Sequence, residues 1–166
     1  IDTAQLAGGD YACDLTLQDD RGKLIILPLR LKVELNGDGT LNNPYLVESL
    51  ADFDGFADIN NSDQYWAAGV HTRLTCDIDL AGRVYDTAVI GPGNKKNGHN
   101  FYGTPYEGVF DGAGHIVRNL TIDATGTGHD FLGLFGFIAG QYAEVKKLGV
   151  EDVSITGDGL NSTDIG

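Results

Sequence analysis

The sequence predicts an all-β protein whose chain winds into a β-solenoid, preceded by a short helix and an extra strand segment. A strand-like phrase occurs twice near the C-terminus: Leu120 in RNLTID and Leu148 in KKLGVED hold matching places 28 positions apart (148 − 120). The 24 glycines supply many tight turns, while 42% hydrophobic residues suffice for a continuous core. Because one circuit of a solenoid cannot bury its own apolar face, such phrases predict circuits stacked on one another.

Residues 1–36 form the first predicted unit, a β-strand segment outside the repeat. From Tyr11 to Leu35 apolar and polar residues alternate on both sides of the turn sequence QDDRGK. This alternation predicts a β-hairpin or two edge strands, since Pro28 is tolerated only at an edge or a bulge. We expect the segment to cap the solenoid or to pair with a strand of a neighbouring molecule.

Residues 37–166 form the second predicted unit, a parallel β-helix. The turn-forming run NGDGTLNNPY marks the boundary, and Ser49 with Asp52 three places later resembles a capping box. Apolar residues then recur at helical spacing, which predicts a helix over about residues 49–59. Such a helix would cover the open first circuit of the solenoid.

The first solenoid strand is predicted in HTRLTCDIDLAG, where alternation places four residues on one face: Leu74, Cys76, Ile78 and Leu80. The next stretch, about residues 82–108, is polar and rich in glycine, which predicts a surface excursion. The circuits resume at Val109 and continue to Ile155.

The formal net charge of −13 argues against nucleic acid and anionic lipid as partners, because an acidic surface repels phosphates. No apolar run reaches the roughly 18 residues that a membrane helix needs. The chain contains no Met, so we interpret Ile1 as a processed end or the start of an excised piece. Together with the acidic composition, this favours a secreted or cell-surface location.

No cofactor is predicted. The spacing of the four histidines does not match a zinc site: His71, His99, His115 and His129. Asp38 in NGDGT and Asp158 in GDGLNSTD have the composition of calcium loops without the EF-hand spacing. Binding of Ca²⁺ and simple Asx-turns are therefore the two alternatives for these residues.

Cys13 and Cys76 lie in strand-like segments, and in an exported chain they could form a disulfide that joins the N-terminal segment to the first circuit. Two buried free thiols are the alternative. Of three sequons, those at Asn60 and Asn161 are the expected glycosylation sites, because Asn119 falls within a predicted strand.

Several phrases in order, DGTLNNPYLV, LTCDIDLAG, FDGAGHIVRNLTI, FLGLFGFIAG and VKKLGVEDVSITG, resemble the GLUG-motif family of right-handed parallel β-helix repeats. The resemblance covers about residues 37–157. Members occur in large secreted and cell-surface proteins, including bacterial adhesin-like proteins and accessory regions of immunoglobulin-A-protease-type enzymes. Two departures are Leu132, where the usual repeat has a second glycine, and residues 11–35, which have no counterpart.

The resemblance implies structural roles for individual residues. Gly112 and Gly114 would form the turn before a strand, and Gly133 and Gly136 would flank two inward side chains. The implied inward ladder of the core consists of Leu120, Ile122, Leu134, Phe135, Leu148 and Val150.

Parallel β-helices also include pectin lyases and polygalacturonases, so an enzyme acting on polysaccharide is the main alternative. Inverting hydrolysis needs two carboxyl groups roughly 6.5–9.5 Å apart. His99 and His115 match only part of the polygalacturonase Gly-His-Gly motif, because each lacks the second glycine. Asp77, Asp79 and Arg73 share one predicted strand, but alternation places all three on its outward face. No catalytic residue is therefore predicted.

Aromatic residues surround the predicted excursion and offer rings for contact with sugars or proteins. Phe101, Tyr102 and Tyr106 are the candidates, whereas Trp66 is expected in the core. We expect a non-catalytic structural or adhesive module, either a subunit of an extracellular fibre or part of a large surface protein. Polysaccharide binding or degradation is the alternative. The expected partners are a second copy through head-to-tail stacking or strand addition, further repeats of the same polypeptide, and surface glycans.

Overall fold

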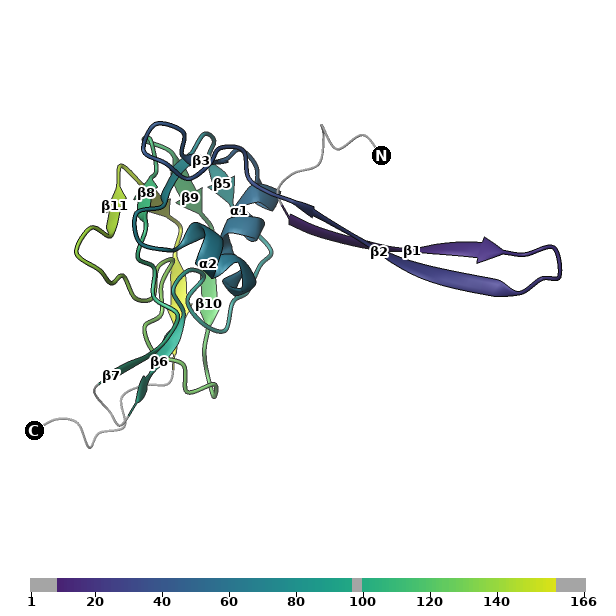
Figure 1. The fold of residues 1–166 in the computed structure, drawn as a ribbon. Helices are drawn as coiled ribbons and strands as arrows, with labels where there is room; N and C mark the ends of the chain where they lie inside the picture. Colours follow the sequence, from purple (N-terminus) through teal and green to yellow (C-terminus); the bar gives the residue numbers. More distant parts are fainter. Residues whose placement is uncertain (1–8, 97–99, 158–166) are drawn as a thin grey trace, which may run out of the picture.

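The computed structural model describes residues 9–96 and 100–157 of the chain. In this part strands are far more common than helices, which confirms the all-β prediction in its general form. The strands and helices form a compact body from which one long hairpin projects (Figure 1).

The projecting hairpin consists of β1 (Gly9–Gln18) and β2 (Leu24–Val33), which pair antiparallel along their full length. The Asp19 carboxylate closes the turn by accepting hydrogen bonds from the backbone N–H groups two and four residues later, at 2.9 and 2.8 Å. The hairpin that the alternation predicts is therefore present. Both strands are edge strands of this two-stranded sheet, which is a position where Pro28 is tolerated.

Three parallel sheets form the wall of the body. The first sheet contains, in spatial order, β3 (Tyr45–Val47), β4 (His71–Leu74), β8 (Val109–Asp111) and β11 (Glu144–Lys146). The second contains β5 (Ile78–Asp79), β9 (Ile116–Arg118) and β12 (Gly149–Glu151). The third contains β10 (Thr121–Asp123) and β13 (Ser154–Thr156). Within each sheet, strands from successive passes of the chain lie side by side in the same direction.

The register gives the length of the last pass. Strand β9 pairs with β12, and β10 with β13, in both cases 33 positions apart (149 − 116 and 154 − 121). The prediction that Leu120 and Leu148 hold matching places is therefore wrong. Leu148 lies instead beside Gly112, where a Cβ atom added to the glycine would be 2.6 Å from the Leu148 Cα.

The two phrases look alike because each marks a corner of the chain. The backbone φ is positive at Asn119 (59°), Lys147 (52°) and Asp152 (52°), and each of these residues is followed by an apolar residue and a short strand. Lys147 and Asp152 are successive corners of one pass, five positions apart (152 − 147). The spacing of 28 is thus the pairing offset of 33 less the five positions between two corners, so the similar phrases mark corners and not paired strands.

Helix α1 (Leu50–Ala57) begins where the capping box predicts it. The Ser49 hydroxyl accepts the backbone N–H of Asp52 at 3.1 Å and donates to the carboxylate of the same residue at 2.8 Å. Two further short helices, η1 (Ile59–Asn61) and α2 (Ser62–Tyr65), follow and were not predicted. None of the helices in the described ranges has the length and apolar character needed to cross a membrane.

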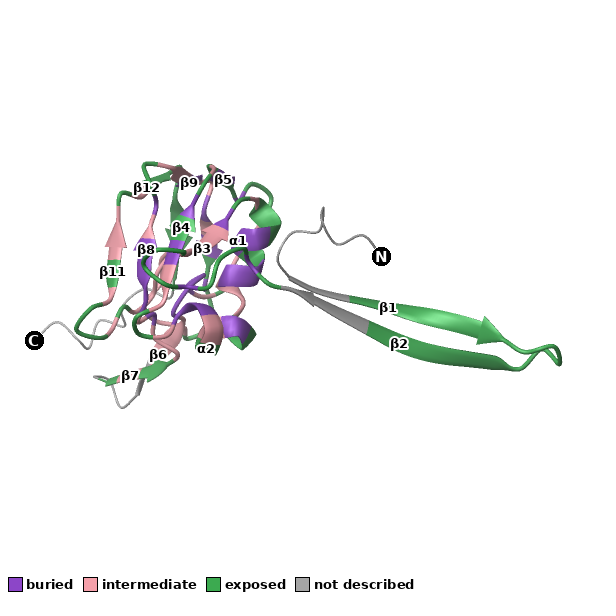
Figure 2. Cartoon of the chain, turned by 45° about the horizontal axis from the view of Figure 1, so that its top comes forward, coloured by how far each residue is buried: buried purple, intermediate pink, exposed green. Residues whose placement is uncertain are grey.

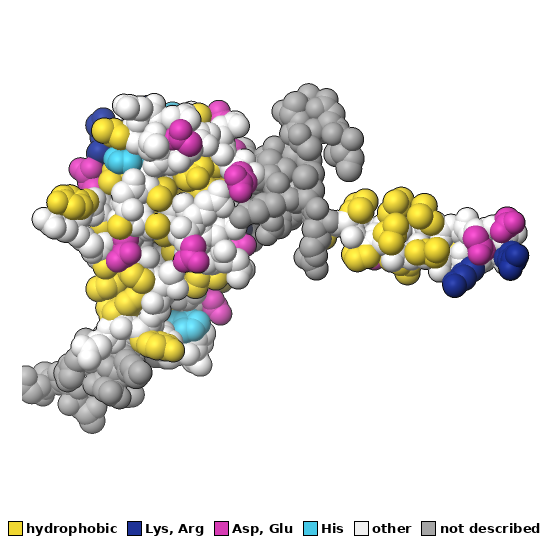
Figure 3. Space-filling model, in the orientation of Figure 1, with side chains coloured by type: hydrophobic (Ala, Val, Ile, Leu, Met, Phe, Trp, Pro, Cys, Tyr) yellow, Lys and Arg dark blue, Asp and Glu magenta, His cyan; other side chains and the backbone are white. Residues whose placement is uncertain are grey.

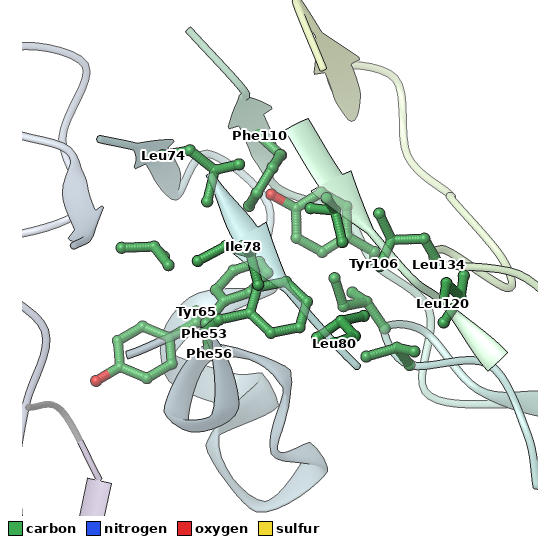
Figure 4. Packing of buried hydrophobic residues seen from close by; sticks show 14 of the residues in the cluster. Phe53, Phe56, Tyr65, Leu74, Ile78, Leu80, Tyr106, Phe110, Leu120 and Leu134 are labelled. Atoms are coloured by element: carbon green, nitrogen blue, oxygen red, sulfur yellow. The ribbon is translucent and has the colours of Figure 1, made fainter. Parts of the chain in front are cut away.

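The hydrophobic core fills the space between α1 and the parallel sheets (Figures 2 and 4). Phe53 and Phe56 of α1 are fully buried, and the Phe56 ring lies 5.2 Å from that of Phe110 on β8. Trp66 is buried as predicted, and its indole N–H donates to the Phe56 carbonyl at 2.8 Å. The helix therefore closes the core with aromatic rings and leaves the indole N–H paired.

The predicted surface excursion at residues 82–108 is shorter in the structure. Four hydrophobic residues in the described part of this stretch are buried: Ala88, Val89, Ile90 and Tyr106. Ile90 forms a parallel bridge with Phe135, and Tyr85 with Ile122, so the chain continues along the wall here. The part that projects is the antiparallel hairpin of β6 (Gly93–Lys96) and β7 (Asn100–Gly103) (Figure 1).

The implied inward ladder is reproduced in part. Three of its members are buried: Leu120, Ile122 and Leu134. Phe135 and Leu148 are half-buried and pack against the core. Val150 is 43% exposed, which corrects its expected inward position. It lies opposite the buried Val117, but β12 is the outermost strand of its sheet among the described strands, so no further strand covers it.

Candidate functional site

One edge of the parallel sheets is open in the part of the chain that the structure describes. Strands β11, β12 and β13 each pair on one side only within the described part of the chain, which leaves a row of backbone groups without a strand partner. Val150, Val153 and Ile155 are 43–47% exposed at this edge. Their neighbours in the preceding pass, such as Ile122 opposite Ile155, are buried. The edge is therefore suited to receive another strand layer with apolar side chains.

Charged side chains connect neighbouring passes on the outer wall. Arg73 and Lys147 lie on either side of Asp111, at 3.7 and 3.9 Å from its carboxylate. On the second sheet, the Asn119 amide donates to the Asp79 carboxylate at 2.8 Å. Exposed ion pairs contribute about 0–1 kcal/mol each, so these contacts favour one register more than they raise the overall stability.

The residues considered for a lyase-like site do not share one straight strand. Strand β4 ends at Leu74 and β5 begins at Ile78, which places Asp77 in the bend between them and separates it from Arg73. The prediction of a single strand carrying all three charges is therefore wrong. The backbone turns here because the wall passes from the first parallel sheet to the second.

Asp77 binds the next pass of the chain at this bend. Its carboxylate accepts the backbone N–H of Ile116 at 3.1 Å and a guanidinium N–H of Arg118 at 2.8 Å, and it lies 3.2 Å from Nδ1 of His115. The hydrogen bond from Ile116 is the main cause that lowers the pKa of Asp77, with smaller contributions from His115 and Arg118. These contacts give Asp77 a structural role, and the other candidate histidine, His99, lies outside the described residues.

Candidate metal ligands are not gathered in the described ranges, where no group of three or more His, Cys, Asp or Glu side chains is placed to hold an ion. The Asp38 carboxylate accepts the backbone N–H of Thr40 at 3.0 Å, which is an Asx-turn. Hydrogen bonding to Thr40 lowers the pKa of Asp38. The second candidate calcium residue, Asp158, lies outside the described residues.

The three candidate aromatic residues occupy different environments. Tyr106 is fully buried, which corrects its expected place on a binding surface, and burial raises the pKa of its hydroxyl. Phe101 is half-buried and stacks on Phe137 with ring centroids 4.2 Å apart. Tyr102 is the next residue of β7, so its side chain lies on the opposite face from that of Phe101, and it is 67% exposed. Tyr102 is therefore the one member of the three that presents its ring to a partner.

Both cysteines are free thiols in the structure, so the Cys13–Cys76 disulfide is not formed. Cys13 is exposed on the projecting hairpin, whereas Cys76 is half-buried in the body. Burial is the main cause that raises the pKa of the Cys76 thiol. Among the sequons, Asn60 is exposed in η1, Asn161 lies outside the described residues, and Asn119 lies at a corner and not within a strand.

A groove that sequence reasoning missed lies between α1, η1 and residues 83–92. It has a volume of about 560 Å³, and Ile59 and Val84 contribute exposed apolar side chains to it. The Arg83 guanidinium forms a two-point ion pair with Asp54 across this groove, with one N–O distance of 2.8 Å. The two residues are 29 positions apart, so no local pattern signals their contact.

Comparison with known proteins gives two long relatives. Over 122 residues the chain is 35% identical to a protein of Evansella cellulosilytica named as a Gly-rich membrane protein, covering 74% of this chain and 12% of the relative. Over 130 residues it is 32% identical to halomucin of Haloquadratum walsbyi, covering 78% of this chain and 1% of that protein. The chain thus spans a small part of each relative. No family model matches the chain, and no solved structure matches it.

Proposed function

We propose that this chain is a non-catalytic structural or adhesive module of the cell surface, built as a right-handed parallel β-helix of the GLUG type. The observation that carries the proposal is the stacking of successive passes in three parallel sheets. In the second sheet Ile78, Val117 and Val150 are aligned as one column, and the first two are buried. A column of this kind is what a coiled chain needs to bury its apolar faces.

The relatives support the location. One is named a membrane protein and the other a halomucin, and both are far longer than the matched region. The net charge of −13 suits an exposed position in solvent, where like charges keep chains apart. In this proposal the chain is one module of a large exported polypeptide that supplies length and surface and leaves chemistry to other proteins.

The open edge of the last pass supplies the proposed contact to the next module or copy. Another layer of strands would pair with β11, β12 and β13 and would cover Val153 and Ile155. Contacts that repeat head to tail extend without closing, so a second copy at this edge would produce a filament. Further repeats of the same polypeptide would use the same edge.

Electron microscopy of the purified chain at high concentration tests the head-to-tail version. Filaments are expected for the wild type and for Ser154→Lys, because Ser154 alternates with the column residues on β13. Ile155→Lys should abolish them, since it places a charge in the column above Ile122. Single particles for the wild type at every concentration would reject head-to-tail stacking and leave further repeats of one polypeptide as the partner.

A glycan-degradation screen with and without Ca²⁺ tests the non-catalytic proposal, and turnover of any polysaccharide would overturn it.

A second candidate function is glycan binding, which Tyr102 favours. Its ring is 67% exposed on β7, next to the Phe101–Phe137 stack that holds this hairpin on the body. Exposed aromatic rings pack well on sugar faces. A glycan array should then lose its signal with Tyr102→Ala and keep it with Tyr142→Ala, a matched control that removes a ring 75% exposed elsewhere. Equal signals from both variants would rule out this role for Tyr102.

A further inference from the structure

The projecting hairpin has one face that is entirely apolar. Because side chains alternate along a strand, residues opposite each other in the ladder share a face. The pairs on this face are Cys13 with Leu29, Leu15 with Leu27, and Leu17 with Ile25. The five aliphatic side chains are 42–47% exposed, and Cys13 is exposed as well. We call these six residues the apolar hairpin face, and Figure 3 shows hydrophobic side chains gathered on this part of the hairpin.

The opposite face of the hairpin is mixed. There Asp14 lies opposite Pro28, Thr16 opposite Ile26 and Gln18 opposite Leu24. The two faces therefore differ in character, as in a sheet that is covered on one side and solvated on the other. A two-stranded hairpin is marginally stable at best in water without such a cover. The apolar hairpin face is accordingly suited to an apolar partner surface.

Charge points to the identity of the occupant. Residues 9–33 contain four acidic residues and four basic residues, so their formal net charge is zero (4 − 4). The whole chain has a formal net charge of −13, so all of this excess lies outside the hairpin. Two copies of the body repel each other, whereas two hairpins do not. The hairpin is thus the surface on which a second copy meets the least electrostatic opposition.

We propose that the apolar hairpin face binds the same face of a second copy, with the two hairpins antiparallel and their tips pointing in opposite directions. An uninterrupted ladder of ten residue pairs is matched in length and composition by its own copy, and a two-fold contact closes on itself. In this arrangement the bodies lie at opposite ends of two overlapping hairpins, each with a ladder roughly 30 Å long. That separation exceeds the Debye length of about 8 Å at physiological salt, so repulsion between the bodies is largely screened.

The size of the face sets the expected affinity. The face spans five positions of each strand, roughly 17 Å, and with two strands about 5 Å apart this gives a footprint of about 170 Å² per copy. Protruding side chains add to this area, but the total surface buried on both copies stays below the roughly 1,200 Å² of a stable standard interface. The dimer is therefore weak, with a dissociation constant on the order of 100 μM. The proposal depends on the hairpin alone and is independent of head-to-tail stacking at β11 to β13.

Sedimentation equilibrium of the whole chain from about 10 μM to 1 mM tests the proposal. The decisive pair of variants is Leu27→Asn and Ile26→Asn. They change adjacent aliphatic residues of β2, 43% and 60% exposed, that lie on opposite faces of the same hairpin. We expect Leu27→Asn to raise the dissociation constant by about tenfold or more, because it removes apolar contact from both copies. Ile26→Asn should leave it within about threefold of the wild-type value, since its side chain lies outside the contact.

Salt dependence and lipid vesicles distinguish other modes of association. Raising NaCl from 0.15 to 1 M should tighten the hairpin dimer by only a few-fold, whereas contact between bodies would be strengthened much more. A monomer at all concentrations, or equal effects of the two variants, would overturn the proposal. Flotation of a monomeric chain with phosphatidylcholine vesicles would assign the face to lipid instead. Circular dichroism of both variants checks that each is folded, and filaments lost with Ile155→Lys but not with Leu27→Asn would mark stacking as a separate contact.

Discussion

Replacing one valine in each of two paired strands tests whether a further layer of strands covers β12 in solution. Val117 and Val150 lie opposite each other in β9 and β12, but Val117 is fully buried and Val150 is 43% exposed. Val117→Ala removes about two buried methyl groups, or roughly 1.6 kcal/mol of transfer free energy, and leaves a cavity that adds about 1 kcal/mol. Val150→Ala loses about half of the transfer contribution and leaves no closed cavity, so its cost should be below about 1 kcal/mol.

Urea denaturation followed by circular dichroism measures both changes in the free energy of unfolding. For a chain of 166 residues, the same energies correspond to a fall in Tm of about 5–10 °C for Val117→Ala and about 1–4 °C for Val150→Ala. Both variants replace valine by alanine at positions that face each other in paired strands. The difference between their losses of unfolding free energy therefore reports only whether another strand layer covers the residue. Equal losses in the two variants would refute the reasoning, since Val150 would then be covered in solution.

The remaining predictions concern a close backbone contact, pH and the helix cap. Gly112→Ala should destabilise the chain by about 2 kcal/mol or more in the same urea assay, because the added Cβ would lie 2.6 Å from the Leu148 Cα. The pKa of Asp77 is lowered mainly by the hydrogen bond from Ile116, so its contribution to stability is fully present above about pH 4 and is lost as the pH falls through the lower folded-state pKa. Asp77→Asn should therefore reduce the fall in unfolding free energy between about pH 4 and lower pH, measured by urea denaturation at each pH. An unchanged fall would show that Asp77 does not contribute to the acid sensitivity of the fold. Ser49→Ala should cost about 1 kcal/mol through loss of the N-cap hydrogen bond, measured as a fall in Tm of a few degrees.

Local patterns predicted the elements whose hydrogen bonds are local. The capping box placed the start of α1 correctly because Ser49 and Asp52 bond within one turn. Alternation predicted the hairpin of β1 and β2 because a two-residue period and a short turn fix which residues can pair. The same alternation placed four residues on one face, Leu74, Cys76, Ile78 and Leu80; the three aliphatic residues are buried and Cys76 is half-buried against the core.

Patterns failed where partners come from distant parts of the chain. Leu120 and Leu148 have similar neighbours in sequence, but parallel pairing is set by corners with positive φ and by the circuit length, which similar phrases do not specify. Tyr106 lies in a polar, glycine-rich stretch yet is buried, because the chain around it returns to the wall and bridges Ile138. The Arg83–Asp54 pair joins segments that only the packing of α1 on the wall brings together.

By itself, the amino-acid sequence determined that this is a strand-rich chain with an N-terminal hairpin and a short capped helix, since period, turn residues and caps act over a few positions. Only the tertiary structure decided which strands are neighbours, that Val117 is covered by a neighbouring strand while no described strand covers Val150, and that six apolar side chains share one exposed hairpin face. The physical reason is that burial and strand pairing depend on what lies alongside a residue in space, and the strand that pairs with β9 comes 33 residues later in the chain.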